Sequence, residues 1–185
     1  MEGPAVNHDA YSDDYIRTIL DEVKTVAMVG ASANAVRPSY FVLKYLLSKG
    51  YEVWPINPGH AGGEILGQRV YASLKDLPGT PDMVDIFRNS AAAGLVVDEI
   101  LAEPMRPKAI WMQLTVRNDA AARKAEAAGI KVVMDRCPKI EYGRLSGEIG
   151  WAGVNSRTLS ARRPTLKAGF QHRGLGGDRK IDPMD

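Results

Sequence analysis

Apolar residues recur in two different patterns between residues 12 and 135. Short, nearly continuous apolar runs predict buried strands at residues 26–29, 51–56, 69–71, 83–87, 109–113 and 131–135. Segments with an apolar stripe on one helical face predict helices at residues 12–23, 38–47, 91–101 and 118–128. Strands that are apolar on both faces are typical of a sheet covered by helices on both sides. The alternation predicts an α/β fold, a doubly wound, mostly parallel sheet of five to six strands, Rossmann-like, with helices on both faces.

Local signals support the helix boundaries. Ser12 and Asn118 are suitable N-caps for the first and last helices. Pro38 stands in the first turn of the second helix, and Gly50 follows its end. Residues 59–67 are rich in glycine, so we expect a flexible loop there.

Length and composition indicate one globular domain with extensions at both ends. The chain has 185 residues, of which 45% are hydrophobic and 25% charged. We expect an N-terminal extension at residues 1–14, the α/β domain at 15–145 and a C-terminal extension at 146–185. Cys137 is the only cysteine and cannot form an intrachain disulfide, which favours a reducing compartment. No apolar run approaches the length of about 20 residues that a membrane helix needs, and the polar, acidic start is no secretory signal. We therefore expect a cytoplasmic protein with no membrane partner.

Positive charge is concentrated in the C-terminal extension. Residues 155–185 hold seven Lys or Arg against three Asp, while the whole chain carries a net charge of +2. Such a tail could dock a protein partner or a second copy of the chain, or it could be a solvated terminus. Nucleic acid binding is not expected, because no aromatic residues for base stacking accompany the charges.

Ligands of open α/β sheets bind outside the carboxyl ends of the strands, where the strand order reverses. In a Rossmann order, this point lies between the strands at residues 26–29 and 83–87. Three turns should meet there, at residues 30–39, 57–60 and 87–90.

The first of these turns has the features of a phosphate-binding loop. A glycine ends the strand, small residues leave room for a ligand, and a helix start aims its N–H groups and positive dipole end at the loop. Arg37 could clamp a phosphate at the mouth of that helix, although it could equally be solvated. The residues expected to line the site are Gly30, Ala31, Ser32, Ala33, Arg37, Pro38 and Ser39.

The second and third turns help to choose the ligand. An NAD site usually has an Asp or Glu at the end of the second strand, but this strand ends WPINPGH with no carboxylate. Asn57 between two prolines would form a stiff turn, and His60 could meet a phosphate or lie in a surface loop. In the third turn, Phe87 could contact an adenine or belong to the core, and Arg88 could meet a phosphate or be solvated.

Five motifs occur in order along roughly residues 15–145, and they read VGAS…RPSY, YxVxPINP, LPxxxDMVDIFRNS, WMQLTV and GIKVVMDRCPKIEYGRL. Together they resemble the stand-alone CoA-binding domain family, which is similar to the nucleotide domain of the succinyl-CoA synthetase alpha subunit. The resemblance implies a Rossmann-like domain that binds CoA or acyl-CoA by its ADP moiety.

Residue roles follow from the resemblance position by position. The first turn would line the pyrophosphate; Asn57, Pro58 and His60 would flank the adenosine. His60 stands where the ligase subunit has a lysine, which weakens that charge. The remaining residues implied are Phe87 and Arg88 at the base, and Gln113, Leu114 and Thr115 near the pantetheine arm.

No catalytic constellation stands out in the sequence. There is no metal-ligand spacing and no Ser-His-Asp pattern, and the chain has no room for the second domain of the ligase subunit. Cys137 follows Arg136 and precedes a helix start, a setting that lowers a thiol pKa, so it could be reactive or could be a small buried hydrophobe.

Two classes of function remain. The first is a non-catalytic module that binds CoA as a sensor, carrier or accessory protein. The second is an enzyme, either an NAD(P)-binding oxidoreductase or an acyl-CoA enzyme that depends on Cys137.

Overall fold

A computed structural model describes residues 6–147. At its centre is a five-stranded sheet in the order β2-β1-β5-β6-β7, with every neighbouring pair parallel. The strands are β1 Thr25–Val29, β2 Glu52–Ile56, β5 Met83–Ile86, β6 Ala109–Met112 and β7 Lys131–Val133. The chain forms β2 on one side of β1 and β5 on the other, so the strand order reverses between β1 and β5. This is the switch point that the sequence predicts.

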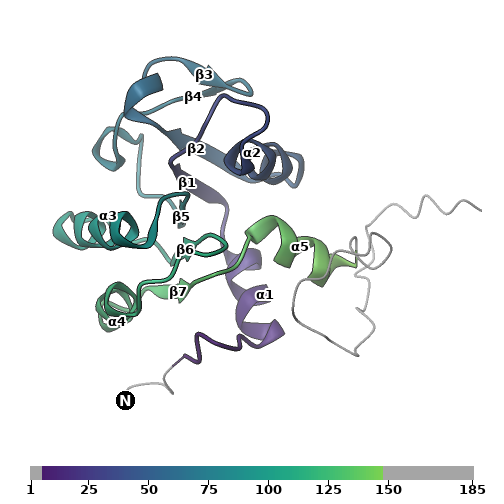
Figure 1. The fold of residues 1–185 in the computed structure, drawn as a ribbon, viewed down its shortest axis with the longest axis vertical. Coiled ribbons are helices and arrows are strands. Elements are labelled where there is room, and N and C mark those ends of the chain that lie inside the picture. The colour runs from purple at the N-terminus through teal and green to yellow at the C-terminus, as the bar shows by residue number, and fades with distance from the viewer. Residues whose placement is uncertain (1–5, 148–185) are drawn as a thin grey trace, which may run out of the picture.

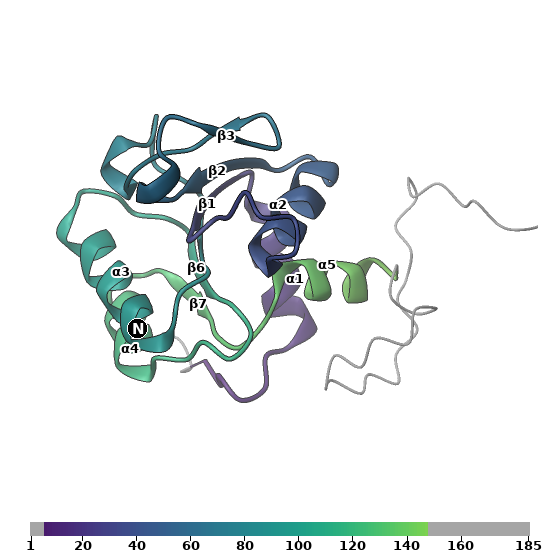
Figure 2. The same cartoon turned by 45° about the horizontal axis from the view of Figure 1, so that its top comes forward.

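Helices cover both faces of the sheet. Figure 1 shows α3 and α4 on one side and α1, α2 and α5 on the other, and the turned view in Figure 2 agrees. The helices are α1 Asp13–Glu22, α2 Pro38–Ser48, α3 Ser90–Ala102, α4 Asp119–Ala127 and α5 Pro138–Ser146. The predicted doubly wound, Rossmann-like α/β fold is confirmed.

Two apolar cores lie on the two faces of the sheet. Successive side chains of a strand point to opposite faces. In β1, Val26 and Met28 pack with residues of α1, α2 and α5, whereas Ala27 and Val29 pack with residues of α3 and α4. Because both faces of each central strand are buried, the strands read in the sequence as unbroken apolar runs.

The helices begin in two different ways. The N-caps of α1, α3 and α4 are Ser12, Asn89 and Asn118, and each side chain accepts a hydrogen bond from a backbone N–H of the first turn. By contrast, α2 and α5 begin with a proline after Arg37 and Cys137, and neither of these residues makes a side-chain cap. Both uncapped helix starts follow strand ends at the carboxyl edge of the sheet.

The segment between β2 and β5 is more ordered than the sequence suggests. Residues 59–67, expected as a flexible loop, contain the end of a 3₁₀ turn (η1, Pro58–His60) and the strand β3, Glu64–Ile65. This strand pairs antiparallel with β4, Gln68–Arg69, in a separate two-stranded sheet. The predicted strand at 69–71 is therefore mostly part of a small hairpin, and only Tyr71 bridges to the main sheet, at Ile56. A second 3₁₀ turn, η2, spans Leu74–Asp76.

The segment before α1 is attached to the sheet. Before α1, the Tyr11 hydroxyl accepts a hydrogen bond from the backbone N–H of Met134 over 2.8 Å, which ties this segment to the chain just after β7. Most of the predicted basic extension lies outside the described residues.

Within residues 6–147, no helix is long and apolar enough to cross a membrane.

Candidate functional site

The three turns predicted to meet at the carboxyl edge are joined by hydrogen bonds. The Phe87 N–H donates to the Val29 carbonyl over 2.8 Å, which ties the end of β5 to the end of β1. The Asn57 side-chain amide donates to the Ala31 carbonyl, also over 2.8 Å, which ties the turn after β2 to the loop after β1. The loops therefore form one connected surface over the switch point.

Gly30 occupies a position that no other residue could fill without strain. Its φ is +87°, a left-handed conformation that favours glycine. A Cβ at this position would lie 2.4 Å from the Phe87 carbonyl oxygen and 3.3 Å from Nε of Arg88. The glycine therefore permits close contact between the first and third turns, and the Arg88 side chain lies against this contact.

The start of α2 leaves one backbone donor, the Ser39 N–H, without an acceptor among the described residues, while the Tyr40 N–H donates to the Arg37 carbonyl over 3.0 Å. Pro38 is the first helical residue, so the first N–H of the helix is that of Ser39. The N-cap residue Arg37 does not cover the helix end with its side chain. An uncapped helix start presents N–H groups and the positive end of the helix dipole, which together favour an anion.

Two arginines flank this helix start and the Gly30 turn. Arg37 and Arg88 are both exposed. Neither guanidinium makes an ion pair or a hydrogen bond with the part of the chain that the structure describes. Guanidinium groups bind phosphate oxygens in a bidentate manner, so both side chains remain available for such a ligand.

The other residues predicted in the first loop differ in exposure. Ala31 is buried and packs in the core, and Ser39 is also buried. The Ser32 hydroxyl accepts a hydrogen bond from the Asn34 N–H over 3.2 Å, which shapes the loop. Ala33 is exposed. Of the small residues predicted to line the site, Ala31 and Ser39 therefore pack inward, and Ala33 lies on the surface.

The turn after β2 is rigid. Asn57 uses both ends of its amide, because its oxygen also accepts the Gly59 N–H over 2.9 Å. Pro58 and His60 follow in the 3₁₀ turn η1 and are exposed beside the first loop. Asn57 therefore connects the two turns, a role that the sequence does not reveal.

No carboxylate ends β2. The acid of this strand, Glu52, is its first residue and accepts a hydrogen bond from the Trp54 indole over 2.8 Å. It therefore lies at the edge of the sheet opposite the three turns. The acid that holds the ribose of NAD in other Rossmann domains has no counterpart at the end of β2.

The Phe87 side chain is half-buried against the core cluster of α1, α2 and α5. Phe87 therefore belongs partly to the core, as one alternative predicts, and part of it stays exposed, as contact with an adenine would require. The face that remains exposed lies at the same edge as Arg88.

A buried acid, Asp85, lies just beneath this edge, although the sequence pattern does not mark it as a site residue. Asp85 is the third residue of β5 and has no solvent exposure. Its Oδ1 accepts a hydrogen bond from Nε2 of Gln113 over 2.8 Å, and its Oδ2 has no partner among the described residues. Burial raises the pKa of Asp85 to about 7, and the bond from Gln113 offsets only part of this shift. The signal in the sequence is one acid within an otherwise apolar strand, MVDIF.

The turn after β6 carries the other residues assigned by resemblance. Gln113 is buried, whereas Leu114 is exposed on the surface. Thr115 has a φ of +69°, and its N–H donates to a carboxylate oxygen of Asp135 over 2.7 Å. Asp135 itself has a φ of +52°. Two non-glycine residues with positive φ therefore face each other after β6 and β7, and such conformations cluster at functional sites.

Cys137 does not have the properties of a reactive thiol. It is buried in the core cluster of α1, α2 and α5. Desolvation raises its pKa to about 11, and the nearby backbone N–H groups of Ile140 and Lys139 offset only part of this. The direction is opposite to the one expected from Arg136 and the helix start, because burial is the larger effect.

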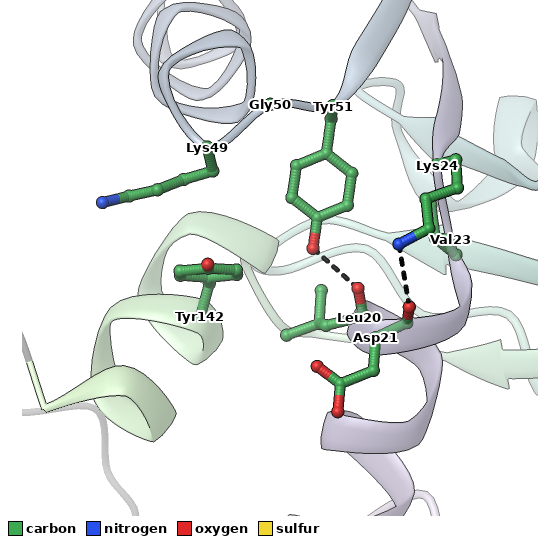
Figure 3. Close-up of a pocket in the computed structure, with 8 residues that line it drawn as sticks. All are labelled: Leu20, Asp21, Val23, Lys24, Lys49, Gly50, Tyr51 and Tyr142. Atoms are coloured by element: carbon green, nitrogen blue, oxygen red, sulfur yellow. Dashed lines mark hydrogen bonds between the residues drawn. The ribbon is translucent and has the colours of Figure 1, made fainter. Parts of the chain in front are cut away.

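Other kinds of site find little support among the residues described. No group of three or more His, Cys, Asp or Glu that could hold a metal ion occurs within residues 6–147. A hollow of about 170 Å³ lies between the ends of α1 and α2 and the side chain of Tyr142 (Figure 3). It is lined by Lys24 and Tyr51, which precede β1 and β2, so it lies at the amino edge of the sheet and away from the three turns.

The sheet order and the helices on both faces define a Rossmann-like α/β domain. The CoA binding domain family matches residues 24–143. The chain belongs to this family.

Small relatives support the assignment over most of their length. The uncharacterized protein YneT of Bacillus subtilis is 35% identical over 127 residues, which are 69% of this chain and 91% of YneT. A hypothetical protein from Pyrococcus horikoshii has a solved structure similar to this one, with 36% identity and a TM-score of 0.68, covering 78% of this chain and 99% of that one.

A larger relative shares a shorter segment. An ADP-forming acetate–CoA ligase II of Archaeoglobus fulgidus is 32% identical over 82 residues, which are 43% of this chain and 11% of the ligase. The predicted resemblance to a CoA-binding domain of a ligase is thus confirmed. The matched segment is only a small part of the ligase.

Proposed function

We propose that the protein binds CoA or acyl-CoA through its ADP moiety and acts as a binding module, such as a sensor, carrier or accessory protein, rather than as an enzyme. The observation that carries this proposal is the uncapped start of α2 beside the Gly30 turn, with Arg37 and Arg88 unpaired among the described residues. The Ser39 N–H, the positive end of the helix dipole and two available guanidinium groups suit the two charges of a pyrophosphate.

The orientation of the ligand follows from the sheet. With the pyrophosphate at the start of α2, the adenosine lies toward the turn after β2, near Pro58 and His60. The pantetheine arm then extends the other way, past the end of β5 toward Gln113 and Leu114. The family membership supports CoA as the ligand, since the family is that of a CoA binding domain.

Both enzyme alternatives have a physical argument against them. An NAD(P) oxidoreductase would need a ribose partner at the end of β2, where Asn57 is already engaged by the Ala31 carbonyl and the Gly59 N–H. An acyl-CoA enzyme that uses Cys137 would need a thiolate near neutral pH, and burial raises the pKa of this thiol to about 11.

The proposal is tested by dividing the ligand into its parts. Calorimetric titration of the full chain with CoA, ADP and pantetheine should show binding of CoA, weaker binding of ADP and little or no binding of pantetheine alone. Binding of pantetheine without binding of ADP would contradict a site that holds the ligand by its ADP moiety.

A further inference from the structure

The Asp85 carboxyl is not explained by the stability of the fold. It lies in the middle of the sheet, next to Met28 of β1 and Trp111 of β6 in the strand register, and is fully buried. Only Oδ1 has a hydrogen-bond partner within residues 6–147. A buried carboxyl with an unsatisfied oxygen costs free energy relative to an apolar side chain of similar size. A reason for the acid must therefore be sought in what it does to Gln113.

The two ends of the Gln113 side-chain amide lie in different settings, because the nitrogen is hydrogen-bonded inside the protein and the oxygen is not. Nε2 donates inward to Asp85 over 2.8 Å. The carbonyl oxygen, Oε1, accepts no hydrogen bond from the described residues, yet it is not among their buried atoms without a partner. This oxygen therefore reaches solvent, although the residue as a whole is only 6% exposed. The arrangement presents a single acceptor at the carboxyl edge.

Hydrogen bonds also fix the backbone around Gln113. The Gln113 carbonyl accepts the N–H of Val116 over 2.9 Å, which closes the turn after β6. The Thr115 N–H donates to the Asp135 side chain, which lies just beyond the end of β7. The acceptor oxygen thus belongs to a fixed turn, as a group that orients a ligand requires.

The position of this acceptor fits the part of CoA beyond the pyrophosphate. β5 separates β1 from β6, so the Gln113 turn lies two strand spacings, about 10 Å, from the Gly30 turn along the sheet edge. The pantetheine arm carries two secondary amides, whose N–H groups are hydrogen-bond donors. An acceptor is what such a group needs when the arm is removed from water.

We propose, building on the proposed function, that Asp85 is a positioning residue that holds the Gln113 amide so that its Oε1 accepts a hydrogen bond from an amide N–H of the pantetheine arm. Asp85 does not touch the ligand. It selects which end of the Gln113 amide faces outward, and thereby gives the site preference for CoA over the bare nucleotide.

Three variants separate this role from a structural one. Asp85→Leu removes the acceptor that holds Gln113, and Asp85→Asn keeps an acceptor oxygen of nearly the same shape. Gln113→Leu removes the proposed ligand contact itself. Each full-length variant is titrated calorimetrically with CoA and with ADP, and its thermal unfolding is recorded to show that it is folded.

The expected pattern is a selective loss. D85L and Q113L should each weaken CoA binding by about three- to tenfold, the worth of one hydrogen bond, and leave ADP binding unchanged. D85N should retain the CoA affinity of the original protein. The double variant D85L/Q113L should bind CoA no more weakly than Q113L, because both changes remove one interaction.

Other outcomes would overturn the proposal in distinguishable ways. Unchanged CoA affinity in folded D85L or Q113L would exclude the positioning role and leave the proposed function intact. Equal loss for CoA and ADP would indicate a structural role for the pair. If the original protein binds neither ligand, the proposed function itself fails. Should D85L not fold, Q113L still tests the ligand contact that the positioning role requires, and unchanged CoA affinity in folded Q113L would exclude the proposal.

Discussion

Gly30 and Phe87 approach each other so closely that a Cβ on Gly30 would lie 2.4 Å from the Phe87 carbonyl oxygen. The contact joins the end of β1 to the end of β5, the two strands between which the strand order reverses. The position of the first loop, and with it the proposed pyrophosphate site, therefore depends on the absence of a side chain at Gly30.

Gly30→Ala should destabilise the protein more than Gly50→Ala does. Both glycines have positive φ, +87° and +85°, but a Cβ at Gly50 would meet nothing within 4 Å. G50A should therefore lower the free energy of unfolding by about 1–2 kcal/mol from backbone strain alone. G30A should add about 1–3 kcal/mol from the overlap with Phe87. Denaturant unfolding measures both values, and equal losses would contradict the close contact.

Arg37→Ala should weaken CoA binding without weakening the fold. The side chain is exposed and has no ion pair among the described residues. Loss of a charge-assisted hydrogen bond to a phosphate should lower the affinity about tenfold or more. The free energy of unfolding should change by less than about 0.5 kcal/mol. Arg123→Ala, which removes an exposed arginine on α4, is the matched control and should leave CoA affinity unchanged.

A loss of stability as the main effect of R37A would show that Arg37 holds the loop rather than the ligand. Equal effects of R37A and R123A on CoA binding would point to general charge attraction. Raising the salt concentration should then remove both effects together.

The stability gained by Asp85→Asn should grow as the pH rises from about 4 to 7. The pKa of Asp85 is 3.8 when exposed and about 7 in the fold. Between these values the folded protein keeps a proton that the unfolded chain releases, so the stability of the original protein falls as the pH rises. The amide that D85N introduces does not titrate, so the difference should approach about 4 kcal/mol above pH 7. Urea unfolding of both proteins at several pH values measures it, and a difference independent of pH would contradict the buried acid.

Cys137 should react slowly with iodoacetamide at neutral pH. Its pKa is raised from 9.0 to about 11, so almost none of the thiol is ionised, and burial also limits access. Mass spectrometry of the folded protein should show alkylation much slower than that of free cysteine, and unfolding in urea should restore the normal rate. A folded protein that reacts as fast as free cysteine would revive the reactive-thiol hypothesis.

Much of the fold can be predicted from the sequence because its signals are local. The proline that opens α2 and the cap of α4 at Asn118 stand at the observed positions. The apolar runs mark the five strands of the main sheet, since both faces of those strands are buried. The hairpin of β3 and β4 is missed because strands of two residues in a glycine-rich segment have no detectable period.

The site is harder to predict because it depends on contacts between distant residues. Asn57 is recognisable as a turn residue, but its bond to the Ala31 carbonyl depends on β1 and β2 lying side by side. The setting of Cys137 beside Arg136 suggests a lowered pKa, whereas the burial that raises it comes from packing against helices remote in the sequence. Asp85 is a single acid in a strand, and its partner Gln113 is 28 residues away.

The proposal of CoA binding is tested most directly by calorimetric titration of the full chain with CoA, NAD, NADP and ATP side by side at one salt concentration. CoA should bind most tightly, and R37A should lose most of that affinity. Tighter binding of NAD than of CoA would contradict the proposal, because the turn after β2 would then hold a dinucleotide ribose without the acid on which such sites depend.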